Sequence, residues 1–290
     1  MEDAPSVSVI VPVWNGEATI GATIRSLLDQ TYPRDAVQII VVDNGSSDNT
    51  KKIVADFAGV LLLEQMKPGS YAARNKGLQK ATGKYVAFTD ADCIADRGWL
   101  AAAIPVLESD PAIGVLAGHI EVVPGAEGSR SAFLVERELS FKQKEAAQRS
   151  TCVTANWVSR RNLVEEAGGF NEKVKSGGDW ILSSRLAASG HRIVYSADAV
   201  VRHPSRSGLF DLLKKRRRVA GGAWTRREVG LLRLVKAEVG GGLRKTLRVT
   251  RSPALRFSEK LTVVPIVLLM AAVSIGELLR LAAGGEPRRA

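Results

Sequence analysis

The chain has 290 residues, 45% of them hydrophobic, which is enough to bury the core of one α/β domain with an appendage. Its two cysteines form no CxxC pair or disulfide framework, and its acidic start lacks the basic region of a secretory signal, so we expect a reducing compartment. The net charge of +11 comes from one segment: residues 205–260 hold 16 Lys and Arg against 4 Asp and Glu, whereas residues 1–204 hold 22 against 24. No nucleic-acid-reading motif accompanies this charge, so we expect no nucleic-acid partner.

The first 100 residues alternate between strand and helix patterns. Asp43 and Asp90 each stand at the carboxyl end of a predicted strand. Strands that alternate with helices pair in parallel, and ligands bind beyond their carboxyl ends, so we expect both aspartates to line one crevice. The predicted strands are 7–15, 37–46, 59–65 and 84–90, and the predicted helices are 19–30, 48–57 and 71–81.

After residue 100 the regular alternation is lost. We interpret the remainder as a mixed extension of the same sheet, which predicts an α/β fold with a mostly parallel sheet flanked by helices. The predicted elements are helices at 99–107, 131–149 (long and polar), 162–167 and 179–189, and strands at 113–125 and 191–196. The predicted domains are a catalytic domain at 1–205, a basic amphipathic helical segment at 206–260 and an apolar membrane-associating helix at 261–283.

The C-terminal region combines basic and apolar sequence. A basic cluster, Lys214–Arg218, precedes the apolar run Leu261–Ile275, and this combination suits an anionic membrane surface. The run is shorter than the roughly 18 residues expected of a spanning helix. Extending it to Ala283 would bury Glu277 and Arg280, an i, i+3 pair that could partly neutralise itself. A spanning helix and an interfacial helix both remain open.

Two carboxylates, Asp90 and Asp92, stand at the carboxyl end of the predicted strand 84–90, after its apolar run 85–88. Carboxylates at i, i+2 repel one another unless a divalent cation lies between them. Oxygen ligands suit Mg²⁺ or Mn²⁺, which commonly bring a phosphate with them. The pair therefore predicts a metal–diphosphate site, with a solvated turn as the alternative. We expect Cys93 and Cys152 to pack rather than react.

Polar clusters follow several predicted strands, at 12–15, 41–50, 88–93 and 176–180. With the interval 69–92 and the later 200–206, their order and spacing resemble the family-2 glycosyltransferases of GT-A fold. The resemblance covers about residues 5–205 and implies inverting, metal-dependent transfer of a sugar from a nucleotide-diphosphate sugar to a hydroxyl.

The resemblance also implies roles on the donor side. Asp43 would accept the imide N–H of uracil, because an ionised carboxylate is purely an acceptor. Asp48 matches a second acidic position, with a helix cap as its alternative. Arg74 would face the diphosphate or else be a solvated helix residue. The implied donor-binding set is Pro12, Val13, Asn15, Glu17, Asp43, Asp48, Arg74, Asn75, Asp90 and Ala91.

The metal set implied by the resemblance is Asp92, Asp90 and His203. Asp92 would ligate Mg²⁺ or Mn²⁺ directly, and Asp90 would contact the ribose or a metal-bound water. His203 would supply a further ligand, with a surface histidine at a strand end as the alternative.

Asp179 matches the general base of the family. The family usually has Glu before this Asp, where this chain has Gly178. We expect the loss of a like-charged neighbour to make Asp179 easier to ionise; Asp179 also opens a predicted helix. Trp180 would stack on an acceptor sugar or pack, and Asn156 and Trp157 match the region that closes over the transferred sugar. These three form the expected acceptor-binding set.

UDP-sugar is the first expectation for the donor and GDP-mannose the second. The basic and apolar tail suggests a lipid-linked or envelope-glycan acceptor at the cytoplasmic face of the cell membrane. The alternatives are a retaining transferase or a nucleotidyltransferase on the same metal site. A non-catalytic membrane-bound protein that binds nucleotide sugars is a further alternative.

Overall fold

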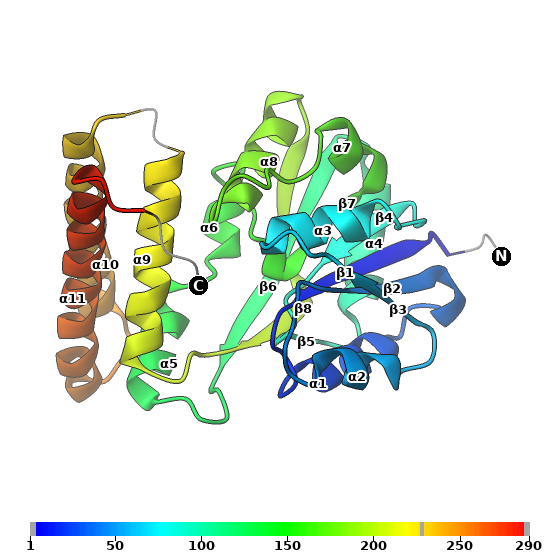
Figure 1. Ribbon diagram of the computed structural model, residues 1–290, viewed down its shortest axis with the longest axis horizontal. Helices are drawn as coiled ribbons and strands as arrows, with labels where there is room; N and C mark the ends of the chain where they lie inside the picture. The colour runs from blue at the N-terminus through cyan, green and yellow to red at the C-terminus, as the bar shows by residue number, and fades with distance from the viewer. Residues whose placement is uncertain (1–3, 227–228, 287–290) are drawn as a thin grey trace. The chain divides into compact units, whose positions relative to one another are not determined.

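A computed structural model describes residues 4–226 and 229–286 (Figure 1). The chain forms two compact units. The first, the sheet unit, takes the described residues up to Glu121 with Lys142–Glu172 and Gly178–His203. The second, the helical unit, takes Val122–Phe141, Lys173–Gly177 and the described residues from Pro204 onward.

The sheet unit is built on one eight-stranded sheet of order β3-β2-β1-β4-β7-β6-β8-β5. Neighbours from β3 to β4 run parallel, whereas β7 runs antiparallel to both β4 and β6, and β5 to β8. The later strands thus extend the parallel half, which confirms the predicted mixed sheet. The strands are β1 (Val7–Val13), β2 (Val37–Asp43), β3 (Val60–Glu64), β4 (Tyr85–Phe88), β5 (Ile94–Ala95), β6 (Ile113–Val123), β7 (Trp157–Arg160) and β8 (Arg192–Pro204).

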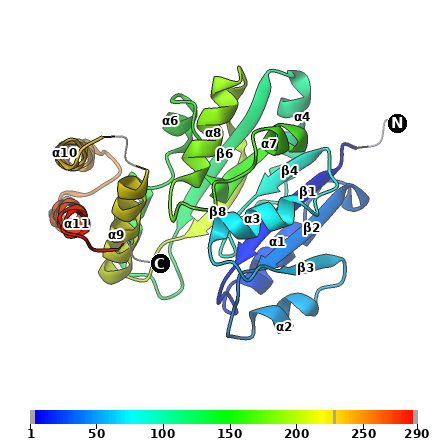
Figure 2. The same ribbon diagram turned by 45° about the horizontal axis from the view of Figure 1, so that its top comes forward.

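The core of this unit lies around β1, every residue of which is buried. Burial on both faces is what a continuous apolar run in a parallel sheet predicts. Helix α3 lies against β1 and β2 (Figures 1 and 2), so closely that a Cβ on Gly77 would stand 2.5 Å from Cγ2 of Ile10. The helices of the sheet unit are α1 (Ile20–Leu28), α2 (Thr50–Ala55), α3 (Ser70–Leu78), α4 (Trp99–Ser109), α6 (Gln143–Ala147), α7 (Arg161–Glu166) and α8 (Gly178–Ala188), with short 3₁₀ turns η1 (Arg34–Ala36) and η2 (Thr154–Asn156).

The prediction of one long polar helix at 131–149 is wrong, because this segment forms two separate helices, α5 (Arg130–Leu139) and α6. Phe141 has a left-handed backbone (φ 53°), which ends helical geometry there. Buried Gln143 then accepts a hydrogen bond from the Val153 amide and donates one to the Asn156 carbonyl. These bonds fix α6 in the sheet unit, whereas α5 belongs to the helical unit.

The helical unit contains α5, α9 (Leu209–Thr225), α10 (Leu231–Arg251) and α11 (Phe257–Ala282). Glu136 of α5 is buried and pairs with Arg206 (2.5 Å) and Lys215 (2.9 Å). The apolar residues 261–283 fall almost entirely within α11, which begins four residues earlier. The hydrophobic core of the unit consists of Ala132, Leu134, Val135, Leu212, Val249, Leu255, Val263 and Val267.

Candidate active site

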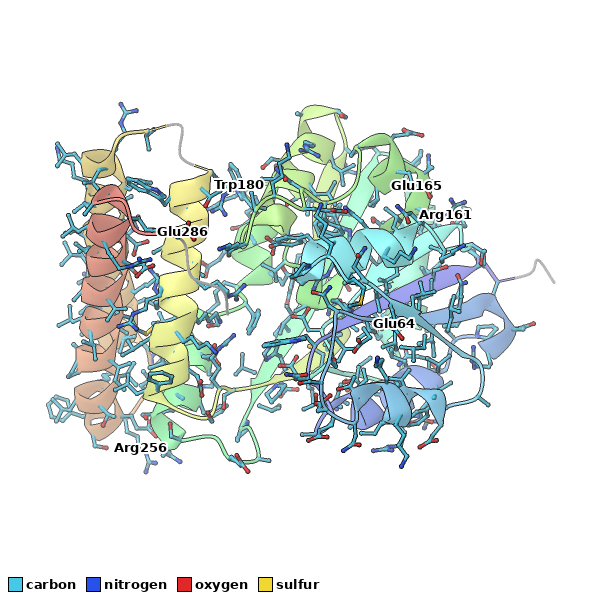
Figure 3. All side chains as sticks on the ribbon, viewed as in Figure 1. Glu64, Arg161, Glu165, Trp180, Arg256 and Glu286 are labelled. Atoms are coloured by element: carbon cyan, nitrogen blue, oxygen red, sulfur yellow. The ribbon has the colours of Figure 1, made fainter. Side chains whose placement is uncertain are left out.

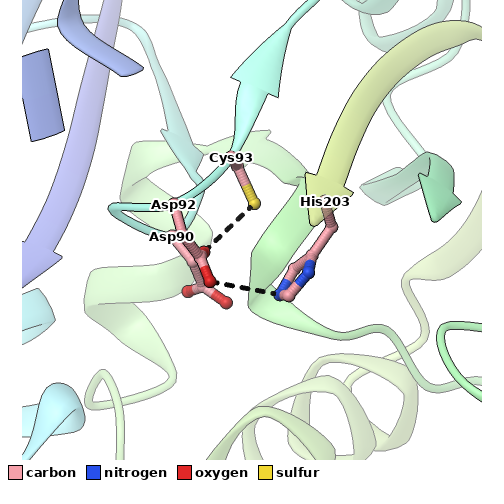
Figure 4. A group of neighbouring side chains, drawn as sticks. All are labelled: Asp90, Asp92, Cys93 and His203. Atoms are coloured by element: carbon pink, nitrogen blue, oxygen red, sulfur yellow. Dashed lines mark hydrogen bonds and ion pairs between the residues drawn. The ribbon is translucent and has the colours of Figure 1, made fainter. Parts of the chain in front are cut away.

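Four potential metal ligands lie together beyond the carboxyl end of β4 (Figure 4). Asp90, Asp92, Cys93 and His203 each offer one ligand atom, and these atoms lie within 4.8 Å of one another. His203 Nε2 is 3.8 Å from Asp92 Oδ2, and Cys93 Sγ is 3.8 Å from Asp92 Oδ1. Antiparallel pairing of Ile94 with Arg202 explains the meeting, because it places the residue after Arg202 beside the residue before Ile94.

The ligand atoms of this cluster fit a hard divalent cation. Burial, together with the charges of Asp90 and Asp92, raises the pKa of the Cys93 thiol well above its ordinary value, so the thiol stays protonated at neutral pH. Two carboxylates and one imidazole remain as donors, and such oxygen and nitrogen ligands suit Mg²⁺ or Mn²⁺. A pair of carboxylates in one small cluster also gives a cation the charge it needs.

Arg74 lies beside this cluster rather than in solvent. Its side chain comes from α3, only 3% of the residue is exposed, and one guanidinium nitrogen is 2.5 Å from Asp90 Oδ1. The Nε of Arg74 is buried with no hydrogen-bond partner in the described part of the chain. The solvated alternative for Arg74 is therefore wrong, and a fixed positive charge stands next to the first carboxylate of the pair.

Asp43 ends β2 and is 1% exposed. Its Oδ2 accepts the backbone N–H groups of Gly45 (3.1 Å) and Ser46 (3.0 Å). Its Oδ1 is buried and has no hydrogen-bond partner within residues 4–226 and 229–286. An unsatisfied buried acceptor is costly, so this oxygen would gain from a donor that a ligand supplies, but the neighbouring side chains would first have to move aside.

Asp179 opens α8, and its Oδ1 accepts hydrogen bonds from the Trp180 amide (2.9 Å) and the Tyr71 hydroxyl (3.4 Å). There is no room for a side chain before it, since a Cβ on Gly178 would stand 2.8 Å from two ring atoms of Tyr71. Burial raises the pKa of Asp179 above its ordinary 3.8, although Arg74 acts to lower it. Desolvation therefore dominates the pKa of Asp179, and the smaller effect of the missing carboxylate at position 178 stays a prediction.

Comparison with known proteins decides the family. Residues 8–168 match the model of glycosyl transferase family 2, and the chain is 33% identical over 224 residues to glycosyltransferase AglE of Haloferax volcanii, covering 75% of this chain and 73% of that one. The chain belongs to glycosyl transferase family 2.

A second sequence relative and a solved structure are also similar to this family-2 glycosyltransferase. It is 41% identical over 98 residues to an Escherichia coli enzyme, UDP-Glc:α-D-GlcNAc-diphosphoundecaprenol β-1,3-glucosyltransferase WfgD, covering 33% of this chain and 36% of that one. Mannosyltransferase PcManGT of Pyrobaculum calidifontis, solved with GDP-Man and Mn²⁺, superimposes with a TM-score of 0.66 at 21% identity over 98% of this chain and 89% of that one. The superposition confirms the GT-A fold.

The loops that follow β1 and β2 in this glycosyltransferase hold one another. Asn15 Oδ1 accepts the Ser47 amide (2.9 Å), Glu17 Oε2 accepts the Asn49 amide (3.0 Å), and Asp48 Oδ2 accepts the Glu17 amide (3.1 Å). Asp48 Oδ1 also accepts the Thr50 amide at the start of α2, although the N-cap position of that helix is Asn49. Pro12 and Val13 lie inside buried β1, so the loop begins two residues later than expected, and Ala91 lies between the two metal-site carboxylates.

Three residues assigned to ligand contacts are instead engaged inside the glycosyltransferase. Asn156 is fully buried, donating to the His119 and Ala199 carbonyls (2.8 and 2.9 Å), and Trp157 is also fully buried. Neither has exposed surface in this structure, and the acceptor role expected for both stays a prediction. Asn75 uses its amide to hold the loop after α7, at 2.9 Å from both the Phe170 amide and carbonyl.

Sequence reasoning missed Tyr71. Its ring stacks on Phe170 with centroids 5.7 Å apart, and its hydroxyl reaches Asp179 across 108 positions of sequence. The one sequence signal for this contact was the glycine at position 178, because the absence of a side chain there leaves the space that the Tyr71 ring occupies. Trp180, by contrast, is 54% exposed and lies at the surface (Figure 3).

Proposed function

We propose that this glycosyltransferase moves a sugar, with inversion, from a nucleotide-diphosphate sugar to a hydroxyl of a lipid-linked or envelope-glycan acceptor. The observation that carries the proposal is the convergence of the Asp90, Asp92 and His203 ligand atoms beyond the sheet edge where Asp43 ends β2. These three residues would hold Mg²⁺ or Mn²⁺, which when bound neutralises the diphosphate leaving group.

Asp43 reads the donor base. Its unpartnered Oδ1 can accept one N–H group, and the imide of uracil has one such group to donate. Guanine also carries an N–H beside a carbonyl, so GDP-mannose remains the second donor after UDP-sugar. Among the relatives, WfgD is named for UDP-Glc and PcManGT is solved with GDP-Man. Asn15, Glu17 and Asp48 complete the proposed nucleotide pocket as a hydrogen-bonded pair of loops.

Asp179 is the proposed general base. The acceptor oxygen attacks the anomeric carbon, the bond to the diphosphate oxygen breaks, and the hydroxyl proton passes to Asp179. A carboxylate whose pKa is raised by burial binds that proton better than a solvated one. Tyr71 orients it by donating to Oδ1, and exposed Trp180 offers a face on which an acceptor sugar stacks.

A membrane partner follows from the tail and from a relative. WfgD is named for a diphosphoundecaprenol acceptor, which is a membrane lipid. We infer that residues 206–283 keep the enzyme at the cytoplasmic face of the cell membrane, where a lipid-linked acceptor would be presented.

The donor screen is the decisive experiment. The full chain is titrated calorimetrically with UDP, GDP and dTDP sugars in the presence and absence of Mn²⁺, and transfer is followed by NMR of the anomeric proton. We expect Mn²⁺-dependent binding of a UDP-sugar and a product of inverted configuration. Retained configuration would identify a retaining transferase, pyrophosphate release a nucleotidyltransferase, and binding without any turnover a non-catalytic protein.

A further inference from the structure

Helix α10 has an apolar stripe in contact with solvent. Leu232, Val239, Leu243 and Leu247 are each between 46% and 68% exposed. Their spacing of seven, four and four residues keeps them on one side of the helix. Such an uncovered stripe on a 21-residue helix is more than the scattered apolar residues of an ordinary surface.

Helix α11 has a matching stripe. Phe257, Leu261, Leu268, Leu269 and Leu279 are between 41% and 77% exposed. The four charged residues of the helix are buried or half-buried, so every exposed position along α11 is uncharged. Those exposed positions are Phe257, Ser258, Leu261, Thr262, Pro265, Leu268, Leu269, Ala272, Gly276, Leu279 and Ala282.

The two stripes lie on the same side of the helix pair. In α10, Glu238 pairs with Arg216 of α9 and Gly242 faces Ala271 of α11; in α11, Ser274 accepts from the same Arg216. Each residue advances about 100° around its helix. Measured from Gly242 on α10 and from Ala271 on α11, where the two helices face each other, each stripe is rotated by about a quarter turn, in the direction away from α9. Because α10 and α11 run antiparallel, these rotations bring both stripes to the side turned away from α9.

Basic residues border this surface along the whole of α10. Arg233, Lys236, Arg244, Arg248 and Arg251 are all exposed, and four of them lie on the flank of the stripe remote from α11. A wide apolar face with a cationic margin matches the boundary between acyl chains and anionic headgroups.

We propose that α10 and α11 lie together in the plane of an anionic phospholipid surface, with their stripes in the acyl boundary, and that α11 does not cross the bilayer. Helix α11, with 26 residues, is long and apolar enough to span a membrane by length and composition. However, α11 packs against Gly242 of α10 and accepts a hydrogen bond from Arg216 of α9. Insertion of α11 would therefore carry the charged residues of α9 and α10 into the hydrocarbon. This inference rests on the proposed membrane attachment of residues 206–283, and it does not depend on the donor or the chemistry.

Vesicle binding tests the surface. The full chain is floated with vesicles of phosphatidylcholine alone or with about one third phosphatidylglycerol, and we expect binding to the anionic vesicles only. The variant Leu243→Gln/Leu268→Gln should lose at least about tenfold in binding, since two buried aliphatic side chains leave the acyl boundary. Ala237→Gln, exposed on α10 away from the stripe, should bind normally. Equal binding to neutral vesicles, or an unaffected double variant, would overturn the proposal.

Cysteine labelling tests the orientation. Cys93 and Cys152 are buried, so cysteines introduced as Ser258→Cys and Ala283→Cys, near the two ends of α11, report alone. On vesicle-bound protein, a membrane-impermeant maleimide added outside should label both positions, and Arg256→Cys, just before α11 and outside its exposed apolar face, repeats the test at the first end. Protection of one end would show that α11 spans. Concentration-dependent dimers with no vesicle binding would assign the surface to a second copy of the chain instead. Either result is independent of donor binding, so it leaves the proposed sugar transfer to its own test.

Discussion

The two units of this protein treat charge and apolar surface in opposite ways. In the sheet unit, two charged side chains keep unused bonding capacity among the described residues, at Oδ1 of Asp43 on β2 and at Nε of Arg74 on α3. In the helical unit, the buried carboxylates of Glu136 and Glu277 are both ion-paired. Exposed large hydrophobic side chains show the reverse distribution. Among the described residues the sheet unit exposes Trp14, Leu61, Met66 and Trp180, whereas the helical unit exposes Leu209, Phe210, Leu232, Val239, Leu243, Leu247, Phe257, Leu261, Leu268, Leu269 and Leu279.

The difference separates two kinds of substitution. A polar group with spare bonding capacity serves a ligand, so removing it should change chemistry and leave stability nearly unaltered. A charge whose partners all come from the same chain serves folding, so removing it should change stability alone. Each of the following variants can break or sharpen this division.

The largest expected effect is that of Asp179→Asn. The amide keeps the shape of the base but cannot take the acceptor proton, so transfer should fall by about 10³-fold. Steady-state kinetics would measure this, and calorimetry should find donor binding unchanged. The control is Asp198→Asn, an exposed aspartate on β8. Full activity of the Asp179→Asn enzyme would refute the proposed base.

His203→Ala should weaken the metal site next. Loss of the imidazole removes one of three donors, so Mn²⁺ affinity should fall by at least about tenfold. Electron paramagnetic resonance of free Mn²⁺ measures this without any substrate. His191→Ala, at a histidine outside the cluster, serves as the comparison. Equal Mn²⁺ affinity in both variants would remove His203 from the site.

Glu136→Gln should act on stability rather than on chemistry. Although burial acts to raise it, Lys215 and Arg206 lower the pKa of Glu136 to about 2. Burial lowers the pKa of Lys215 to about 8, so Arg206 is the partner that keeps its charge at every accessible pH. The variant leaves these cations without a counter-charge and should lose about 3 kcal/mol in the helical unit.

Hydrogen exchange of residues 130–139 measures that loss, with exposed Glu127→Gln as the control. In the unmodified chain, the contribution of Glu136 is fully present above its ordinary pKa of 4.5 and disappears as pH falls toward 2. The Gln variant should lack this acid-dependent part. A variant that exchanges like the unmodified chain would break the proposed division.

Tyr71→Phe should have the smallest effect. A hydrogen bond donated to a carboxylate favours the charged form, so its loss should raise the pKa of Asp179 further. The acid limb of the kcat profile, already above the ordinary aspartate value, should move up by a few tenths of a pH unit, since the bond is long. Tyr195→Phe is the matched control, and a profile that moves to lower pH would contradict the orienting role.

The parallel half of the fold was predictable because alternating apolar and amphipathic runs allow one arrangement. The meeting of Asp90 with His203 was expected only from the family resemblance, because local sequence patterns do not show that the two-residue strand β5 pairs with β8. The contacts that the sequence did not show share a cause. Asn156 and Trp157 sit in a polar-looking segment whose burial depends on partners as distant as Trp99, and the contact between Tyr71 and Gly178 links positions more than 100 residues apart. Sequence patterns report local geometry, whereas burial is decided by chain segments that arrive from elsewhere.

Helix α3 has a further consequence. Tyr71 and Arg74 stand one turn apart on it, the first touching the proposed base and the second touching Asp90. Gly77 presses the same helix onto Ile10 with no space to spare. This nine-residue helix therefore fixes the spacing between the proposed base, Asp179, and the proposed metal ligand, Asp90. A methyl group added at Gly77 would displace the helix from Ile10, and so would shift Tyr71 and Arg74 together although it touches neither Asp179 nor Asp90.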